Sequence, residues 1–393
     1  MPTAARRRVA GRPGLVRVGL AVTTACNLRC GYCYQRRGEV RIVSWEVAQA
    51  ACDLLLAAGT AEPELGFRGG EPLLEIPLMR RVASYLERQA PPGARPRLGV
   101  TTNGTRVDAE ALRFLAAWRA RTGISFDGVE PAQELRAPGT FACLDASLGR
   151  LRTDFPGYFG ECVTIGMTLN SANLPFLAAS VRYFLERGVR SLALAPQETA
   201  DPGWDTRCCD ELDRQLAEAA RLCRDHHKRT GEVPFWPFRP PAGRRPRRPQ
   251  DAPMCRLGDG HALFVDVDGT VTGCGQFAPA TARLDTGLAR RAAAAATVGH
   301  VTDPDLDERL ARSNQALRAV GLFHGKERKR SPYRSCGACP LLGECRVCPM
   351  AIAAQPGNED PDLVPPLPCA FTMLAAKHRR RVPRPRSGAP AFG

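Results

Sequence analysis

Three cysteines stand close together near the start of the chain. Cys26, Cys30 and Cys33 lie in TTACNLRCGYCYQRRG, residues 23–38, with the spacing C-x₃-C-x₂-C. A structural zinc ion usually takes four protein ligands and a disulfide takes two. Three thiolates can each bind one iron of a cubane 4Fe–4S cluster, which leaves the fourth iron open for a substrate or cofactor. The spacing therefore predicts a cluster with one open position; the alternative is a zinc site that lacks a ligand.

A second group of cysteines lies in the last third of the chain. It begins at residue 255 and includes a dense run with the spacing C-x₂-C-x₅-C-x₂-C. Seven thiols are too many for one four-coordinate ion and nearly enough for two clusters. A zinc ribbon over 336–348 is the alternative, and the cysteines on either side of that run argue against it. The seven are Cys255, Cys274, Cys336, Cys339, Cys345, Cys348 and Cys369.

Composition limits the class of protein. The chain has 393 residues, 44% hydrophobic and 24% charged, which is ordinary for a globular protein. It has no apolar run of ~20 residues and no secretory signal, so we expect no membrane partner. Sixteen cysteines without an export signal predict a cytoplasmic protein with metal or cluster ligands rather than disulfides. The net charge of +15 comes mostly from dispersed Arg, so nucleic acid is not the favoured partner.

Six apolar segments predict the strands that position these residues. Amphipathic helices follow most of them, with Ser44, Asp108 and Asn173 as start signals. Such repetition predicts parallel strands with right-handed crossovers. Six units are too few for a closed eight-stranded barrel, so the prediction is an α/β fold with an open, partial (β/α)₆ barrel. The predicted strands are 15–23, 64–68, 97–102, 122–126, 162–169 and 191–195.

The pattern changes after a predicted helix at 211–231. We expect an N-terminal tail (1–14), the barrel (15–233), a Pro/Arg-rich linker (234–253), a small cysteine-rich domain (254–379) and a C-terminal tail (380–393). A hairpin with an Asp-Gly turn is predicted at 261–274. Cys208 and Cys209 are expected in a loop, without an assigned role.

The motif CNLRCGYC resembles the signature loop of the radical S-adenosylmethionine (SAM) enzymes. In that family the open iron binds SAM, and an electron from the cluster cleaves the sulfonium to give a 5′-deoxyadenosyl radical that removes hydrogen from a substrate. Further motifs follow the predicted strands: GGEP at 69–72, TTNG at 101–104 and SFDG at 125–128. The resemblance covers roughly residues 15–235.

The resemblance implies a set of SAM contacts. Tyr32 lies along the adenine, Glu71 receives the ammonium group, and Arg136 clamps the carboxylate by forked hydrogen bonding. The glycines of GGEP are expected to let the backbone approach a ligand. Plain strand-end turns are the alternative for TTNG and SFDG, and a surface salt bridge is the alternative for Arg136. The full set is Tyr32, Gly69, Gly70, Glu71, Asn103, Ser125, Asp127, Arg136 and Asn170.

The order of the second cysteine group resembles the SPASM extension of peptide-modifying radical SAM enzymes. It implies two auxiliary 4Fe–4S clusters, for three clusters in all. Auxiliary cluster I is held by Cys255, Cys274 and Cys348, and auxiliary cluster II by Cys336, Cys339, Cys345 and Cys369. The family usually has three residues where two separate Cys345 from Cys348. Some relatives have a further cysteine shortly after the position of Cys255, and this chain does not. Cluster I would therefore have an open iron, a ligand from the peptide, or His261 as a ligand. The commoner role for a His at such a position is that of an ordinary strand residue.

The predicted function is a radical SAM/SPASM maturase that acts on a ribosomally made precursor peptide, with crosslinking or related oxidation. The alternatives are an anaerobic sulfatase-maturing enzyme, a small-molecule dehydrogenase or epimerase, and an electron carrier. Gly275 stands where sulfatase-maturing enzymes have a catalytic aspartate, which disfavours that alternative. Expected partners are a flavodoxin or ferredoxin-type electron donor and a leader peptide. About fourteen residues precede the first strand, so leader binding is expected to use the barrel, the linker or a separate protein.

Overall fold

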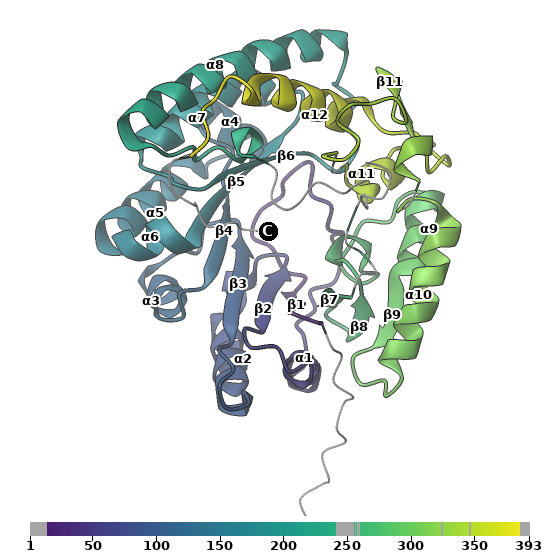
Figure 1. Cartoon of the computed structure of the whole chain (residues 1–393). Helices are drawn as coiled ribbons and strands as arrows, with labels where there is room; N and C mark the ends of the chain where they lie inside the picture. The colour runs from purple at the N-terminus through teal and green to yellow at the C-terminus, as the bar shows by residue number, and fades with distance from the viewer. Residues whose placement is uncertain are drawn as a thin grey trace, which may run out of the picture.

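The computed structural model describes residues 14–240, 255, 257, 260–323, 325–345 and 347–385. The predicted tail residues 1–13 and 386–393 and linker residues 241–253 lie outside these ranges. Six parallel strands form an open arc with the predicted order of neighbours, and most of the helices between them cover its outer side (Figure 1). The partial barrel is therefore confirmed. Its strands are β1 (Arg17–Thr23), β2 (Glu64–Gly69), β3 (Arg97–Thr102), β4 (Arg121–Ser125), β5 (Val163–Leu169) and β6 (Leu192–Pro196).

Local signals explain where several helices begin. The Ser44 side chain accepts a hydrogen bond from the Val47 amide at the start of α1, and Asp108 does the same for Ala111 at the start of α3. Asn173 instead precedes a short 3₁₀ turn and does not cap it with its side chain. The barrel helices are α1 (Trp45–Ala57), α2 (Ile76–Gln89), α3 (Ala109–Ala117), α4 (Glu130–Arg136), α5 (Phe141–Asp154), α6 (Pro156–Cys162), α7 (Leu177–Glu186) and α8 (Thr206–Thr230).

The predicted hairpin extends the barrel sheet rather than standing apart from it. Strand β7 (Ala262–Val265) pairs in parallel with β1, and β8 (Thr270–Thr272) returns antiparallel beside it. With β9 (Thr297–His300) the sheet has nine strands in the order β6-β5-β4-β3-β2-β1-β7-β8-β9. The remaining elements are α9 (Gly287–Ala296), α10 (Leu306–Val320), β10 (Arg330–Ser331), β11 (Arg334–Ser335), α11 (Pro349–Ala353) and α12 (Pro366–Arg379).

One expectation was wrong, and the structure adds detail at three segment boundaries. Cys208 and Cys209 lie in the first turn of α8 rather than in a loop, because Asp205 caps the helix by accepting from the Cys208 amide. Residues 234–240, expected in the linker, pack against the barrel, because Phe235 and Phe238 are buried in its core. The C-terminal tail starts later than residue 380, since the Arg384 carbonyl lies 3.1 Å from the His227 ring. Residue 14 lies beside the sheet, since the Gly14 carbonyl lies 2.7 Å from the His261 ring.

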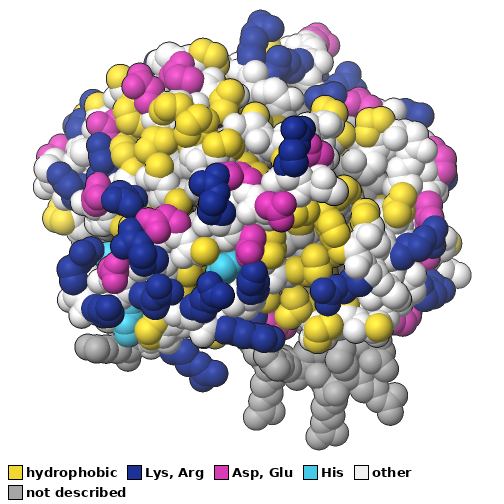
Figure 2. Space-filling model, turned by 90° about the horizontal axis from the view of Figure 1, so that it is seen from above, with side chains coloured by type: hydrophobic (Ala, Val, Ile, Leu, Met, Phe, Trp, Pro, Cys, Tyr) yellow, Lys and Arg dark blue, Asp and Glu magenta, His cyan; other side chains and the backbone are white. Residues whose placement is uncertain are grey.

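Two hydrophobic clusters underlie the fold. The larger one fills the space between the barrel sheet and its helices and includes the side chains of β7 to β9. A smaller one gathers α9, α11 and the cysteine-dense segment, with Phe277 and Phe323 in edge contact at its centre. Figure 2 shows Lys and Arg gathered over one part of the surface, with Asp and Glu among them. Within the described residues, no helix is both long and apolar enough to span a membrane.

Candidate active site at the carboxyl ends of the strands

The loop that carries Cys26, Cys30 and Cys33 begins where β1 ends. Backbone hydrogen bonds attach its start to the GGEP segment after β2: the Gly70 amide donates to Thr23 O (2.8 Å) and the Glu71 amide to Ala25 O (2.7 Å). Within the loop the Cys33 amide donates to Cys30 O at 3.2 Å. The chain thus enters the three-cysteine loop in a direction that is set by two neighbouring strands.

The glycines of GGEP make a close backbone contact. A Cβ on Gly70 would lie 2.0 Å from Ala25 O, and one on Gly69 would lie 2.3 Å from Thr23 O. Gly69 also has a φ of +135°, which side chains rarely adopt. These glycines therefore allow a close approach to the backbone that leads into the cysteine loop, and their expected approach to a ligand stays a prediction.

Glu71 braces the ends of two strands. Its side chain is fully buried and accepts hydrogen bonds from the Leu73 amide (3.0 Å), the Thr102 hydroxyl (2.7 Å) and the Asn103 amide (2.6 Å). Burial raises the pKa of Glu71, and these hydrogen bonds oppose that shift. The carboxylate therefore holds the strand ends together, and its expected contact with an ammonium group stays a prediction.

Asn103 links that brace to the first cysteine. Its side-chain amide lies 3.8 Å from Cys26 Sγ and donates to Asn27 Oδ1 at 2.9 Å, while its own carbonyl accepts from the Thr105 hydroxyl at 2.7 Å. Burial raises the pKa of Cys26 and of Cys30. The residues of TTNG thus do more than turn the chain, because they reach the cysteine loop directly.

A second polar group joins the cysteine loop to the fourth strand. The Tyr32 hydroxyl donates to Asp127, and Arg136 donates to the Tyr32 hydroxyl (2.9 Å) and to Asp127 Oδ1 (3.2 Å). The Thr168 amide also donates to Asp127 at 2.8 Å. This arrangement draws Tyr32, Asp127 and Arg136 together from the loop, from the end of β4 and from α4.

Arg136 is a buried ion-pair partner, not a surface salt bridge. Its side chain is 11% exposed and that of Asp127 is 1% exposed. Burial tends to lower the pKa of Arg136, but attraction to Asp127 and Tyr32 raises it overall, and burial raises the pKa of Tyr32. Among the described residues, Arg136 Nε is buried and lacks a hydrogen-bond partner. A free guanidinium donor of this kind suits a carboxylate, so these residues fit the methionine end of SAM.

The two other expected contacts lie at neighbouring strand ends. Ser125 is the last residue of β4, two positions before Asp127. Asn170 follows β5 and exchanges hydrogen bonds of 3.0 Å with Asn173, each side-chain carbonyl accepting from the other residue's amide. Both residues therefore lie on the same rim as the cysteine loop, and their roles toward a ligand stay predictions.

The structure gathers the cysteines expected at auxiliary cluster I. Cys255 and Cys274 interact electrostatically, and both interact with Cys348. The Cys348 thiol donates to Gln276 Oε1 at 3.2 Å, and Gln276 Nε2 donates to Glu198. Burial raises the pKa of Cys274 to about 12 and raises that of Cys348 well above its ordinary value. The Nδ1 atom of His261 pairs with the backbone oxygen of Gly14.

The second expected set also comes together. A cavity of about 40 Å³ is lined by Cys336, Cys339, Cys345 and Cys369, with Lys326 and Lys329 among its other walls. Burial, followed by the neighbouring thiols, raises the pKa of Cys336 to about 11. Among the described residues, no three His, Cys, Asp or Glu side chains are placed to hold a single metal ion.

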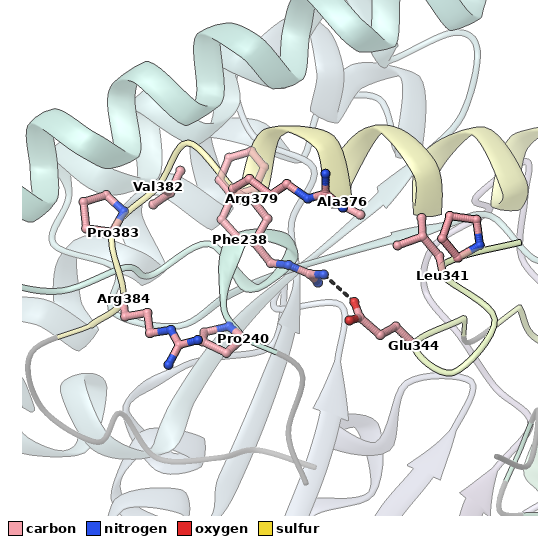
Figure 3. A pocket seen from close by; sticks show the side chains of 11 residues that line it. Phe238, Pro240, Leu341, Glu344, Ala376, Arg379, Val382, Pro383 and Arg384 are labelled. Carbon is pink, nitrogen blue, oxygen red and sulfur yellow. Dashed lines mark hydrogen bonds and ion pairs between the residues drawn. The ribbon is translucent and has the colours of Figure 1, made fainter. Parts of the chain in front are cut away.

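A larger hollow lies on the outer side of the second cysteine set. Its volume is about 360 Å³, and Phe238, Leu341 and Val382 supply apolar walls (Figure 3). Arg379 forms an ion pair with Glu344 across it, and Arg380 and Arg384 also line it. It therefore combines apolar and basic side chains between α12 and the segment after Cys339.

Sequence reasoning missed two kinds of site residue. Glu198 and Gln276 meet although 78 positions separate them, and no local motif signals that contact. The sheet also aligns glycines on adjacent strands: Gly19 pairs with Gly66, and Gly66 with Gly99. Most predicted strands contain one glycine, and this regularity could have indicated that the glycines line up across the sheet.

Comparisons with known proteins agree with this geometry. Residues 20–170 match the Radical SAM superfamily model. An uncharacterized protein of Methanocaldococcus jannaschii is 28% identical over 185 residues, 46% of this chain and 62% of that protein. The GTP 3′,8-cyclase of Chlorobaculum tepidum is 33% identical over 115 residues, 29% of this chain and 33% of that enzyme. The chain thus matches less than two thirds of either relative's length.

Solved structures share the fold over nearly the whole chain. Native anSMEcpe with bound AdoMet and Kp18Cys peptide has a TM-score of 0.68 at 16% identity, over 92% of this chain and 96% of that one. Streptococcus suis SuiB bound to precursor peptide SuiA has a TM-score of 0.53 at 15% identity, over 89% and 74%. The agreement extends beyond residue 170 and includes the cysteine-rich part.

Proposed function

The chain carries a radical SAM domain over residues 20–170, and from that premise we propose that it matures a ribosomally made precursor peptide. The family match and the fold support an enzyme that catalyses a radical reaction. In our proposal it cleaves SAM reductively and uses the 5′-deoxyadenosyl radical to remove hydrogen from the peptide. Crosslinking or a related oxidation of the peptide follows.

The observation that carries the proposal is the position of the second cysteine region. Strand β7 pairs with β1, and Gln276 beyond the hairpin reaches Glu198 beyond β6, so the region faces the same barrel as the cysteine loop. When a carbon radical closes into a new bond, one electron must leave the substrate. Clusters at the two cysteine sets would supply an acceptor for that electron.

The proposed roles of the barrel residues follow from their contacts. Cys26, Cys30 and Cys33 would hold the cluster that supplies the electron for SAM cleavage. Arg136 has a buried donor to offer the SAM carboxylate, and Tyr32 and Asp127 hold its guanidinium in place. Glu71 and Asn103 position the loop, as their hydrogen bonds to two strand ends indicate.

Gly275 weakens the sulfatase-maturing alternative further. A Cβ at this position would lie 2.7 Å from the Phe264 ring, which therefore occupies the space where an aspartate side chain would begin. Formylglycine formation needs a base beside the substrate Cys or Ser. The chain at Gly275 offers none, and Gln276 cannot accept a proton.

The similarity to GTP 3′,8-cyclases supports a shared radical SAM domain, and it gives little support for a shared substrate. The match with the Chlorobaculum enzyme spans 33% of that enzyme, whereas the solved peptide-bound structures align with 92% and 89% of this chain. The precursor peptide with its leader, and a flavodoxin or ferredoxin-type electron donor, are the partners that we propose. The apolar and basic hollow at Phe238 and Arg384 is one place where a leader could bind.

The test begins with a search of the neighbouring genes for a short open reading frame, whose peptide is then used as substrate. Reduced enzyme with SAM should remove two hydrogen atoms from that peptide per modification, read by mass spectrometry, and should make no aldehyde from sulfatase-derived Cys or Ser peptides. Reconstituted protein should bind about 12 iron, ~4 for each cluster. Replacing Cys26, Cys30 and Cys33 with Ala should remove a third of the iron and abolish 5′-deoxyadenosine release. Efficient formylglycine production, or an unchanged peptide mass with deuterium taken up from solvent, would overturn the proposal in favour of the sulfatase or epimerase alternative.

A further inference from the structure

Glu198 occupies a fixed position between the two cysteine regions. It follows β6 in a short loop that hydrogen bonds hold at both ends. The Gln197 amide donates to Leu169 O at 2.8 Å, and the Thr199 hydroxyl donates to Tyr32 O at 3.3 Å. The loop is therefore tied to β5 on one side and to the first cysteine loop on the other, which fixes the backbone at Glu198.

The Glu198 carboxylate faces the cysteines expected at auxiliary cluster I. It accepts a hydrogen bond from the Gln276 amide, and the Cys348 thiol, which donates to Gln276 Oε1 at 3.2 Å, lies close enough for its charge to interact with that of Glu198. The charge of Glu198 also acts on Cys274, and Cys274 in turn interacts with Cys255. The carboxylate is thus near two of the three thiols, and the third is a neighbour of Cys274.

This group of side chains has an unbalanced charge. Among the residues that the structure describes, Glu198 pairs with the Gln276 amide and makes no ion pair with Arg, Lys or His. The carboxylate is partly shielded from water and has no counter-ion, and three adjacent thiols can only add negative charge. A cation bound between them would balance the charge of all four groups.

We propose that Glu198 is the fourth protein ligand of the cluster at Cys255, Cys274 and Cys348. The inference rests on the proposed function only in requiring a cluster there. Three thiols leave one iron of a four-iron cluster without a protein ligand, and Glu198 supplies an oxygen donor to it. On assembly the thiols and the carboxyl lose their protons to solvent, as metal ligands do.

His261 is the other residue that the sequence offered for this position. Its Nδ1 pairs with Gly14 O at 2.7 Å, and the side chain is exposed at the start of β7. The groups that act most strongly on the pKa of Cys274 and Cys348 include Glu198 and the neighbouring thiols rather than His261. Glu198 is therefore the better-placed ligand.

An oxygen ligand has measurable consequences. A carboxylate donates less electron density to iron than a thiolate and binds soft iron–sulfur sites more weakly. Replacement of a thiolate by a less electron-donating ligand raises the potential of other iron–sulfur centres. The cluster at Glu198 should therefore have a higher reduction potential than its all-cysteine form, and the iron at that corner should be the easiest to remove.

The experiment uses full-length protein in which Cys26, Cys30 and Cys33 are Ala, so that only the auxiliary clusters remain. This parent should hold ~8 iron. Adding Glu198→Gln, which keeps the side-chain size and an acceptor for Gln276, should lose about one iron on mild oxidation and give the paramagnetic signal of a three-iron cluster. Glu198→Cys should retain the iron and lower the reduction potential, and it also shows that a change at this position leaves the protein folded.

Glu186→Gln, an exposed glutamate on α7, is the matched control and should leave iron content, spectrum and potential unchanged. Iron content, spectrum and potential of Glu198→Gln identical to those of the parent would overturn the inference. A parent with only ~4 iron, all of it retained when Cys348 is also replaced by Ala, would instead show that no cluster forms at Cys255, Cys274 and Cys348. That result would overturn the three-cluster assignment together with the ligand.

Discussion

The two cysteine regions are held in different ways. The loop with Cys26, Cys30 and Cys33 is tied by Gly70, Glu71 and Asn103 to the ends of β2 and β3, two strands whose apolar side chains belong to the large barrel core. The described residues of segment 325–363 form two strands of two residues each, a 3₁₀ turn and one five-residue helix, and part of the segment packs into the smaller hydrophobic cluster. The first region is shaped by the sheet, whereas we expect the second to depend on the clusters that we propose at its cysteines.

This difference indicates a division of labour, in which the first region would bind SAM and the second would transfer electrons. A site that must present one open iron to SAM needs a loop whose direction is fixed before any ligand binds. Sites that pass an electron onward need their ligands close together and shielded from water, and bound clusters can organise much of the surrounding chain themselves. We therefore expect substitutions in the two regions to fail in different ways.

The largest effect should come from Gly70→Ala. The new methyl group would meet Ala25 O at 2.0 Å, so the cysteine loop must move away from the GGEP segment. We expect a loss of at least about 100-fold in 5′-deoxyadenosine release, measured by chromatography, and about 1–3 kcal/mol of destabilisation from backbone strain. Gly31→Ala is the control in the same loop, because nothing lies within 4 Å of its Cβ position. Equal losses in both variants would show that the fit of Gly70 against β1 does not position the loop.

Removal of iron should have the second-largest effect, and it should change the protease sensitivity of only one of the two regions. After chelation we expect limited proteolysis to cut within 325–363, because that segment has little regular structure of its own. The barrel, residues 14–240, should stay intact, because its strands and helices share a continuous core. The cut sites are read by mass spectrometry of the fragments. Early cleavage in the loop 24–43 instead would mean that the first region also depends on its cluster.

Tyr32→Phe should have the smallest effect. It removes the hydrogen bond to Asp127 and the one that the hydroxyl accepts from Arg136 (2.9 Å), while Arg136 and Thr168 keep their own contacts with Asp127. A loss of about 1 kcal/mol corresponds to roughly a fivefold rise in KM for SAM. Tyr158→Phe is the control: it removes buried hydrogen bonds to Thr122 and Ala120, at the opposite end of β4. That variant should lose stability without a change in KM, and a KM rise in both would mean that the effect is not local to Tyr32.

The elements that have a local sequence pattern were predicted from the sequence, whereas contacts between distant parts of the chain were missed. Six strand segments, the hairpin and the caps at Ser44 and Asp108 follow from local patterns and agree with the structure. The start of α8 was missed because Asp205 lies ahead of the apolar pattern that defines the helix. The pairing of β7 with β1 was missed because it joins residues about 245 positions apart, as Arg17 with Ala262.

The same contrast between local patterns and distant contacts applies to the candidate site. The two cysteine groupings were expected from a resemblance, and the structure brings the members of each group near one another. The contact of the GGEP glycines with the backbone before the cysteine loop was missed, because a glycine pair signals close approach but not what approaches. Glu198 carries no motif at all, and only the fold brings it from the end of β6 to Cys348.

The most direct test of this division of labour compares wild type with Cys369→Ala, by measuring 5′-deoxyadenosine and oxidised peptide in the same reactions. Cys369 lies with Cys336, Cys339 and Cys345, away from the first loop. We predict that the variant releases 5′-deoxyadenosine as wild type does but makes little oxidised peptide, because the radical site is intact and the electron lacks its acceptor. Equal yields of oxidised peptide from both proteins, or loss of both products in the variant, would contradict the account.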